Sequence, residues 1–104
     1  MGHTGLNIGE KRMINVSVYD IKNDRLIEYQ VIANPPEYHR LRTAYCRGAI
    51  AAFQNKSSSN NPYEAKNGWG NTWNITWDNG YQDFTHGKIK ILRMILKNES
   101  RFRQ

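Results

Sequence analysis

Hydrophobic and polar residues alternate in two stretches near the N-terminus. Every second residue from Ile14 to Val18 is apolar, and the same alternation runs from Ile27 to Val31. Residues 22–25, between the two stretches, are polar and contain turn-forming residues. The pattern predicts a β-hairpin over residues 13–32. Because an isolated hairpin is only marginally stable in water, its apolar side must pack against helices or a third strand.

A helix-start signal follows the hairpin. Asn34 can cap a helix, Pro35 suits a first turn, and Glu37 stands where a capping box places an acid. We therefore predict a helix from this point to about Gln54. Gly48 lies inside it at a cost of about 1 kcal/mol relative to alanine, which close packing of a helix or an indole ring would explain. The predicted apolar face comprises Tyr38, Leu41, Tyr45, Gly48, Ala49 and Ala52.

Aromatic residues recur at every fourth position in the second half of the chain. These residues are Trp69, Trp73, Trp77 and Tyr81. The spacing places the four rings near one helix face. It predicts a helix from about Asn71 to Thr85, after a loop over residues 56–61 and before an end cap at Gly87. We expect the rings at positions 73, 77 and 81 to pack on the first helix, and the loop to leave Tyr63 and Trp69 either exposed or packed.

Residues 88–97 fit two structures. As a strand they begin with alternating residues and could extend the hairpin; as a helix they would place Lys90, Arg93 and Lys97 on one basic face. We favour the strand because the hairpin needs cover. The expected fold class is α+β: an N-terminal β-hairpin packed on two helices, ββαα, with this segment as a candidate third strand.

The length of 104 residues predicts one small domain. We expect a flexible leader over residues 1–12, the domain over residues 13–97 and a basic tail over residues 98–104. The hydrophobic fraction of 38% is low, but an aromatic fraction of 12% argues against disorder.

The positive charge is concentrated at the C-terminus. The formal net charge is +6. Acidic and basic residues balance over residues 1–35, whereas six basic residues stand against one acidic residue over residues 88–104. A basic end of this kind favours an anionic partner, nucleic acid first, although a solvated tail would look the same.

The sequence offers little for catalysis. The one cysteine, Cys46, precludes an internal disulfide, and we expect it to be structural. Metal-ligand spacing, a phosphate-binding loop and a catalytic pair are missing from the sequence. We therefore predict no enzyme activity, no catalytic residues, no metal and no cofactor. No apolar run approaches the ~20 residues of a membrane span, and the single cysteine fits a cytoplasmic setting.

The order of features between the two helices resembles the ribosome modulation factor family. That family has an arginine-glycine pair and alanines in a first helix, a proline-tyrosine pair in a loop, and two tryptophans four apart before a glycine in a second helix. The matching residues are Arg47, Gly48, Ala49, Ala52, Asn61, Pro62, Tyr63, Trp73, Trp77 and Gly80. The resemblance covers residues 38–84 and implies a small protein that binds the ribosome and silences translation.

The chain departs from that family in three ways. It adds the hairpin and the basic C-terminal segment, and it has asparagine where the family has a cysteine before the proline. The second helix carries Asp78 and Asp83 and has no lysine or arginine from Asn67 to Gly87. Any ribosomal RNA contact that the family makes through this helix would be lost here.

We therefore expect a ribosome- or RNA-binding protein that modulates translation, with ribosomal RNA or the ribosome as partner. Basic side chains would meet phosphates and aromatic rings would stack on bases, giving an affinity that falls steeply with salt. The alternative is a phage- or mobile-element-type effector that inhibits one host protein through the hairpin edge or an aromatic patch. The candidate nucleic-acid-binding residues are Arg40, Arg47, Lys56, Tyr63, Lys66, Trp69, Lys88, Lys90, Arg93 and Lys97.

Overall fold

The computed structural model describes residues 11–64 and 69–95, with the backbone alone at residues 69–71 and 95. Three strands and two helices follow in the order ββααβ, which confirms the α+β fold and the third strand. Their bounds are β1 (Arg12–Asp20), β2 (Arg25–Ala33), α1 (His39–Phe53), the short 3-10 helix η2 (Ser58–Asn60), α2 (Trp69–Thr85) and β3 (Lys90–Ile95). Residues 1–10 of the predicted leader and all of the predicted tail lie outside the described residues.

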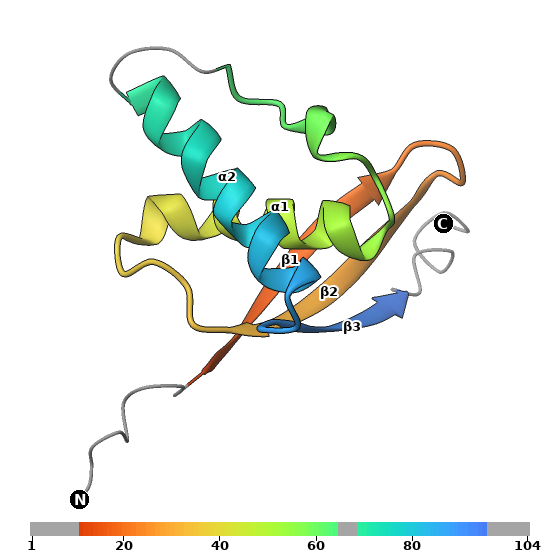
Figure 1. Cartoon of the computed structure of the whole chain (residues 1–104). Coiled ribbons are helices and arrows are strands. Elements are labelled where there is room, and N and C mark those ends of the chain that lie inside the picture. The colour runs from red at the N-terminus through yellow and green to blue at the C-terminus, as the bar shows by residue number, and fades with distance from the viewer. Residues whose placement is uncertain (1–10, 65–68, 96–104) are drawn as a thin grey trace, which may run out of the picture.

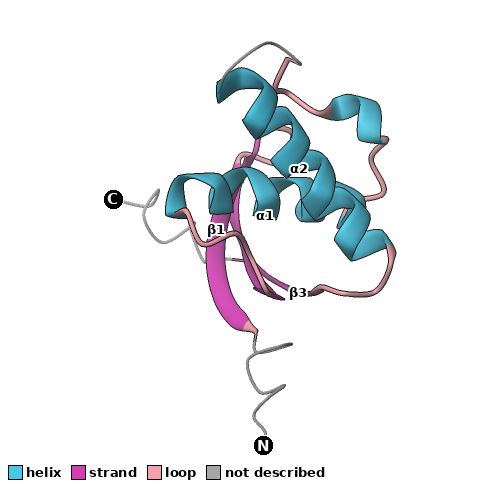
Figure 2. Cartoon of the chain, turned by 60° about the vertical axis from the view of Figure 1, so that its left-hand side comes forward, coloured by secondary structure: helices cyan, strands magenta, loops and turns pink. Residues whose placement is uncertain are grey.

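The strands form an antiparallel sheet in the order β1-β2-β3, so that β2 is central. Both helices lie on one face of this sheet (Figures 1 and 2). Tyr29 of β2 is paired with Val16 of β1 on one side and with Arg93 of β3 on the other. These three residues therefore point to the helix-covered face, which we call the inner face.

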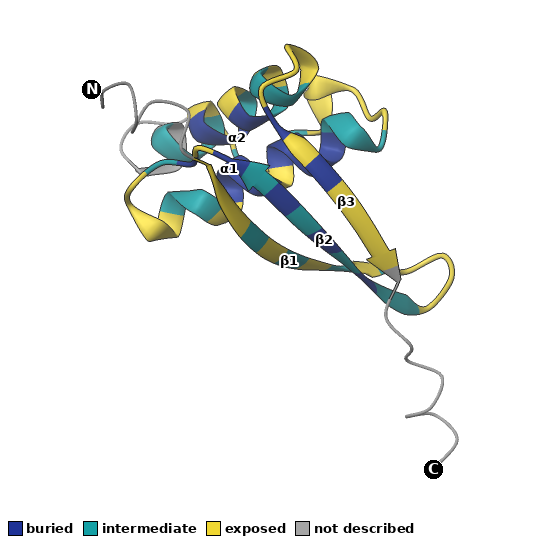
Figure 3. Cartoon of the chain, turned by 90° about the horizontal axis from the view of Figure 1, so that it is seen from below, coloured by how far each residue is buried: buried dark blue, intermediate teal, exposed yellow. Residues whose placement is uncertain are grey.

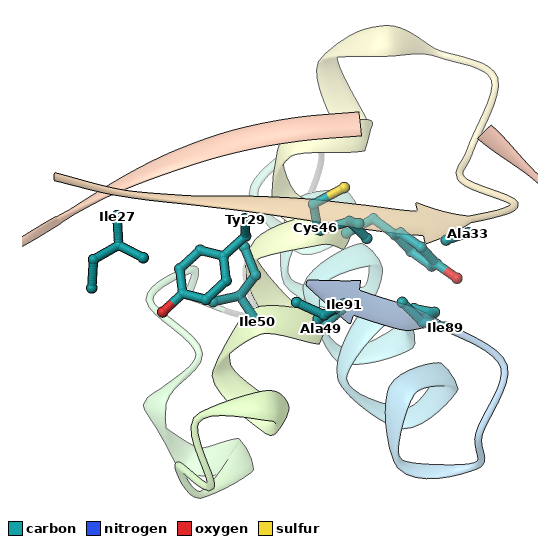
Figure 4. Packing of buried hydrophobic residues seen from close by; sticks show 10 residues of the cluster. Ile27, Tyr29, Ala33, Cys46, Ala49, Ile50, Ile89 and Ile91 are labelled. Carbon is teal, nitrogen blue, oxygen red and sulfur yellow. The ribbon is translucent and has the colours of Figure 1, made fainter. Parts of the chain in front are cut away.

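The core lies between the central strand and α1 (Figure 4). The ring of Tyr29 meets Phe53 of α1 edge to face, with ring centroids 6.0 Å apart, and Phe53 meets Phe84 of α2 at 5.8 Å. This aromatic chain joins the sheet to both helices. The buried cluster comprises Ile27, Tyr29, Val31, Ala33, Tyr45, Cys46, Ala49, Ile50, Ile89 and Ile91.

The tryptophan helix packs on α1 as predicted. Trp77 is only 2% exposed, and its ring stacks on that of Tyr81 with ring centroids 5.6 Å apart. Trp73 and Tyr81 are half-buried. Gly48 of α1 lies against the backbone of Trp77, which confirms that this glycine permits close packing.

The first helix begins later than its sequence signal suggested. It starts at His39, because β2 continues to Ala33, which pairs with Arg12. The following Pro35 and Pro36 disfavour helical geometry in the residues before them. The residues between β2 and α1 are held by Arg42 of the helix. Its guanidinium donates to the carbonyls of Pro36 at 3.0 Å and Glu37 at 3.1 Å.

Both helices end in the same way. Asn55 after α1 and Gly87 after α2 adopt positive φ angles of 65° and 79°. The amides of the next residues, Lys56 and Lys88, donate back into the last turns at 2.9 Å, as in a Schellman motif. The cap predicted at Gly87 is confirmed. At its other end α2 begins at Trp69, two residues before the predicted start.

Candidate nucleic-acid interface

Two adjoining hollows run along the inner side of β1. The first, of about 710 Å³, lies under the β1–β2 hairpin, where the sheet extends beyond the helices (Figure 3). The second, of about 340 Å³, lies between β1, the C-terminal half of α1 and the loop after it. They share Val18, Tyr19, Gln54 and Lys56. We call the two hollows together the basic groove.

Basic side chains from four parts of the chain line this groove. They are Arg25 of β2, Arg47 of α1, Lys56 of the loop and Arg93 of β3. The lining has one carboxylate, Asp20, which pairs with Arg25 at 3.3 Å. A hydrogen bond from the Asn23 side chain lowers the pKa of Asp20, so this acid is ionised at neutral pH. The groove therefore keeps an excess of positive charge.

The fold explains why residues distant in sequence meet here. Arg93 alternates with the outward-facing residues of β3 and is paired with Tyr29, so it lies on the inner face. The backbone of Lys56 is fixed by a hydrogen bond that its carbonyl accepts from the Tyr81 hydroxyl at 2.6 Å, while the residue itself is exposed. Arg47 is exposed although both of its neighbours along α1 are buried.

Apolar and aromatic side chains also line the groove. Val18, Ile27, Tyr29 and Phe53 line the larger hollow. Gln54, which lines both hollows, donates to the Tyr29 hydroxyl at 2.8 Å. A ligand in this groove would therefore contact apolar side chains as well as cations.

Tyr19 borders the groove on the edge strand β1. It lines both hollows, is 52% exposed, and its hydroxyl donates to Asp24 in the hairpin turn. Neither Tyr19 nor Arg25 was among the predicted site residues, because the hairpin half of the chain is neutral overall. The feature of the sequence that could have indicated these two residues is their position, because both lie beside the turn at residues 21–24.

Three of the predicted basic site residues are described but do not line the groove. Arg40 is exposed in the first turn of α1. Lys88 and Lys90 are exposed where β3 starts, beside Ile32 near the far end of β2, and Lys11 donates to the carbonyl of Lys88 at 3.0 Å. Lys11, Lys88 and Lys90 make a second basic region, separate from Arg47, Lys56 and Arg93.

The predicted aromatic site residues have other surroundings. Tyr63 is half-buried, with its ring edge to face on Trp73 at 5.5 Å. Two hydrogen bonds hold the loop of Tyr63 on α2. The Asn61 side chain donates to the Asn74 carbonyl at 2.9 Å, and the Asn74 side chain donates to the Tyr63 carbonyl at 2.5 Å. The side chain of Trp69 lies outside the described residues, although its backbone begins α2 rather than a loop. Lys66 and Lys97 also lie outside them.

Among residues 11–64 and 69–95, no helix or strand covers the face of the sheet opposite the helices. Met13 of β1 and Leu92 and Met94 of β3 are exposed there, next to half-buried residues of β2 such as Glu28 and Gln30 (Figure 3). We call this the outer face. It combines apolar and polar side chains, which is typical of a sheet face that either meets water or binds a partner.

The described residues hold no group of three His, Cys, Asp or Glu side chains that could bind a metal ion. Cys46 is fully buried, as expected for a structural residue, and burial raises the pKa of its thiol to about 11. Within the same residues, no helix has the length and apolar character to cross a bilayer.

The residues that carry the resemblance to the ribosome modulation factor family have two kinds of position. Gly48, Trp77 and Gly80 meet at the helix crossing, while Arg47 lines the basic groove. The residues of the resemblance thus include a contact between the two helices and one charged residue of the basic groove. No family model matches the chain, and neither a curated protein nor a solved structure matches it.

Proposed function

We propose that this protein binds structured RNA through the basic groove. The observation that supports the proposal is that Arg25, Arg47, Lys56 and Arg93 line two adjoining hollows, whose lining contains a single carboxylate. Arginine and lysine side chains neutralise phosphates, and the release of counterions from RNA then supplies much of the binding free energy.

The shape and lining of the groove also favour RNA. Tyr19 borders both hollows with half of its surface exposed, so an unpaired base could stack on the exposed ring. The arginines that line the groove present planar guanidinium groups that match phosphate geometry. A neutral metabolite would leave these cations without a counter-charge.

The ribosome is the first RNA target to test. This choice rests on the resemblance to the ribosome modulation factor family, in which Arg47 stands in the arginine-glycine pair. The expected biological effect is a change in translation. Because α2 has no lysine or arginine, we expect the contact on α1, the following loop and the sheet rather than on the tryptophan helix.

The test is co-sedimentation with purified ribosomes, and fluorescence anisotropy with ribosomal RNA fragments, over a salt series. The double variant Arg47→Gln/Lys56→Gln removes two groove cations. Arg40→Gln/Lys90→Gln removes one arginine and one lysine from exposed positions that do not line the groove, and is the matched control. We expect the groove variant to bind at least about tenfold more weakly and to lower the slope of log affinity against log salt by about 1–2.

Equal losses in the two variants would show that binding depends on overall charge and not on the groove. No binding of the unmodified protein to ribosomes or to RNA at low salt would reject the proposed function. Circular dichroism and thermal unfolding of each variant separate a lost contact from a lost fold.

A second candidate function is binding to one protein partner, as in the effector alternative drawn from the sequence. The observation that favours it is the outer face, where Met13, Leu92 and Met94 are exposed together on one side of the sheet. Such a complex would depend weakly on salt. The variant Leu92→Ser/Met94→Ser should abolish it and leave RNA binding unchanged, whereas Arg47→Gln/Lys56→Gln should do the reverse.

A further inference from the structure

The outer edge of β1 has no strand beside it among the described residues, where β2 is the only strand that pairs with β1. The exposed edge is long, because β1 spans nine residues. It is also uncharged from Met13 to Tyr19. Natural proteins usually protect such an edge with lysine, proline or a bulge, since its free N–H and C=O groups can pair with another strand.

We propose that β1 pairs with β1 of a second copy of this chain, in an antiparallel arrangement with a two-fold axis at Val16. The sequence of β1 is self-complementary about that residue. In this register Ile14 faces Val18 of the second copy and Asn15 faces Ser17. Met13 likewise faces Tyr19, so that apolar residues oppose apolar ones and small polar residues oppose each other.

The two ends of the strand add charge complementarity. In the same register Arg12 of each copy faces Asp20 of the other, which gives one ion pair at each end of the joined strands. Arg12 is exposed, and Asp20 is already held in an ionised state beside Arg25. A shift of the register by two residues would break both ion pairs, so the charges select one alignment rather than supply most of the affinity.

The inner face of β1 also has apolar surface that a second copy would cover. Ile14, Val16 and Val18 pack against the core but are only half-buried, whereas the corresponding residues of β2 are buried. Antiparallel pairing about a perpendicular two-fold axis keeps both sets on the same side of a continuous six-stranded sheet. The same three side chains would then bury surface against their copies.

The opposite edge of the sheet does not have these properties. β3 carries Lys90 and Arg93, and Lys88 precedes it. Pairing β3 with its own copy about Leu92 would place Lys90 opposite Met94, and pairing it about Arg93 would place two arginines opposite each other. The charge distribution therefore favours β1 as the self-pairing edge.

The experiment is sedimentation equilibrium of the full chain from micromolar to millimolar concentration, with a matched pair of variants. Asn15 and Ser17 are exposed on the outer face, next to Gln30 and Glu28 of β2, so both tolerate charged side chains without loss of core packing. Asn15→Lys/Ser17→Lys places like charges opposite each other twice across the two-fold axis. Asn15→Glu/Ser17→Lys places opposite charges there instead.

We expect a monomer–dimer equilibrium for the unmodified chain. The dilysine variant should raise the dimer dissociation constant at least about tenfold, and the Glu/Lys variant should restore or strengthen the dimer. A chain that is monomeric at millimolar concentration would overturn the proposal. So would a dimer that the dilysine variant leaves intact, because another surface would then join the copies.

The two proposals share part of β1, because Ser17 lines the smaller hollow of the groove and Val18 and Tyr19 line both hollows. The RNA affinity of the dilysine variant is therefore compared with that of Asn15→Glu/Ser17→Lys, which carries the same substitution at Ser17. Equal RNA binding by a monomeric dilysine variant and a dimeric Glu/Lys variant would support both proposals. Loss of the dimer interface alone and loss of RNA affinity alone are therefore distinguishable in the same set of variants.

Discussion

Gly48 of α1 and Gly80 of α2 occupy equivalent positions at the crossing of the two helices. A Cβ atom at Gly48 would lie 1.9 Å from the carbonyl oxygen of Trp77, and a Cβ atom at Gly80 would lie 1.9 Å from that of Tyr45. Each glycine follows an aromatic residue by three positions, and each packs against the backbone of the other helix's aromatic residue. The contact is thus reciprocal and backbone to backbone.

Alanine at either glycine should destabilise the protein. The methyl group would push the helix backbones apart, and we expect the free energy of unfolding to fall by about 1–3 kcal/mol. In an unhindered helix the same substitution would raise the free energy of unfolding by up to about 1 kcal/mol, so the expected change here has the opposite sign. Urea unfolding of Gly48→Ala and Gly80→Ala measures the effect, and Asn79→Ala, at an exposed position of α2, is the control. Unchanged stability in both glycine variants would contradict the close contact.

Truncation of Trp77 should have the largest effect of any single substitution in α2. The residue is 2% exposed, so Trp77→Ala leaves a large cavity and should lower the free energy of unfolding by about 3–5 kcal/mol. Ile75→Ala, at a residue that is 49% exposed on the same helix, should change it by less than about 0.5 kcal/mol. Thermal unfolding compares the two, and similar melting temperatures would remove Trp77 from the core.

The hydrogen bond from Tyr45 to Asp83 should stabilise the packing of α1 on α2. The hydroxyl donates to the carboxylate at 2.5 Å, and Tyr45→Phe should lower the free energy of unfolding by roughly 1.5 kcal/mol. Asp83→Ala should add little in the Tyr45→Phe background, because the shared interaction is already lost. Equal and additive losses in this double-mutant cycle would show that the two residues act separately.

Alkaline pH should weaken the fold through Cys46. Burial raises the pKa of the thiol from 9.0 to about 11, so the folded protein keeps its proton where the unfolded chain loses it. The stabilising effect is complete below pH 9 and is lost as the pH rises towards 11, with a slope of up to about 1.4 kcal/mol per pH unit. Urea unfolding between pH 8 and 10 measures this slope.

Cys46→Ala is the matched variant for that slope. It should flatten the pH dependence between pH 9 and 10, while the contribution of Tyr45, whose pKa burial also raises, remains above pH 10. A thiol reagent should leave the native protein unmodified at pH 8 and react once it is unfolded. Rapid modification of the folded protein would contradict the buried position.

The sequence predicted the sheet well because the strand pattern is local. Alternation from Ile14 to Val18 and from Ile27 to Val31 is enough to identify the inner face of a hairpin. The start of α1 was predicted wrongly because the capping signal at Asn34 is equally local and competes with the pairing of Ala33 in β2. Because Ala33 pairs in β2 and the two prolines disfavour helical geometry in the residues before them, the helix does not start at Asn34.

The groove could be predicted only in part. Arg47, Lys56 and Arg93 were recognisable as basic residues, but their meeting depends on how α1, its following loop and β3 pack together. Arg25 was not predicted, because its charge cancels that of Asp20 in the net charge of the segment. In the structure both residues line the larger hollow. Net charge over a segment does not reveal which face each charge occupies.

The central strand of the sheet acquires its second neighbour only at residues 90–95, after the chain has passed through both helices. A chain that ends or is cut before Lys90 would keep the hairpin and both helices but would lose Ile91 from the core and leave the edge of β2 bare. During synthesis the sheet can therefore be completed only after residues 90–95 have been made. Proteolysis in the short connection between α2 and β3 should accordingly release no stable fragment.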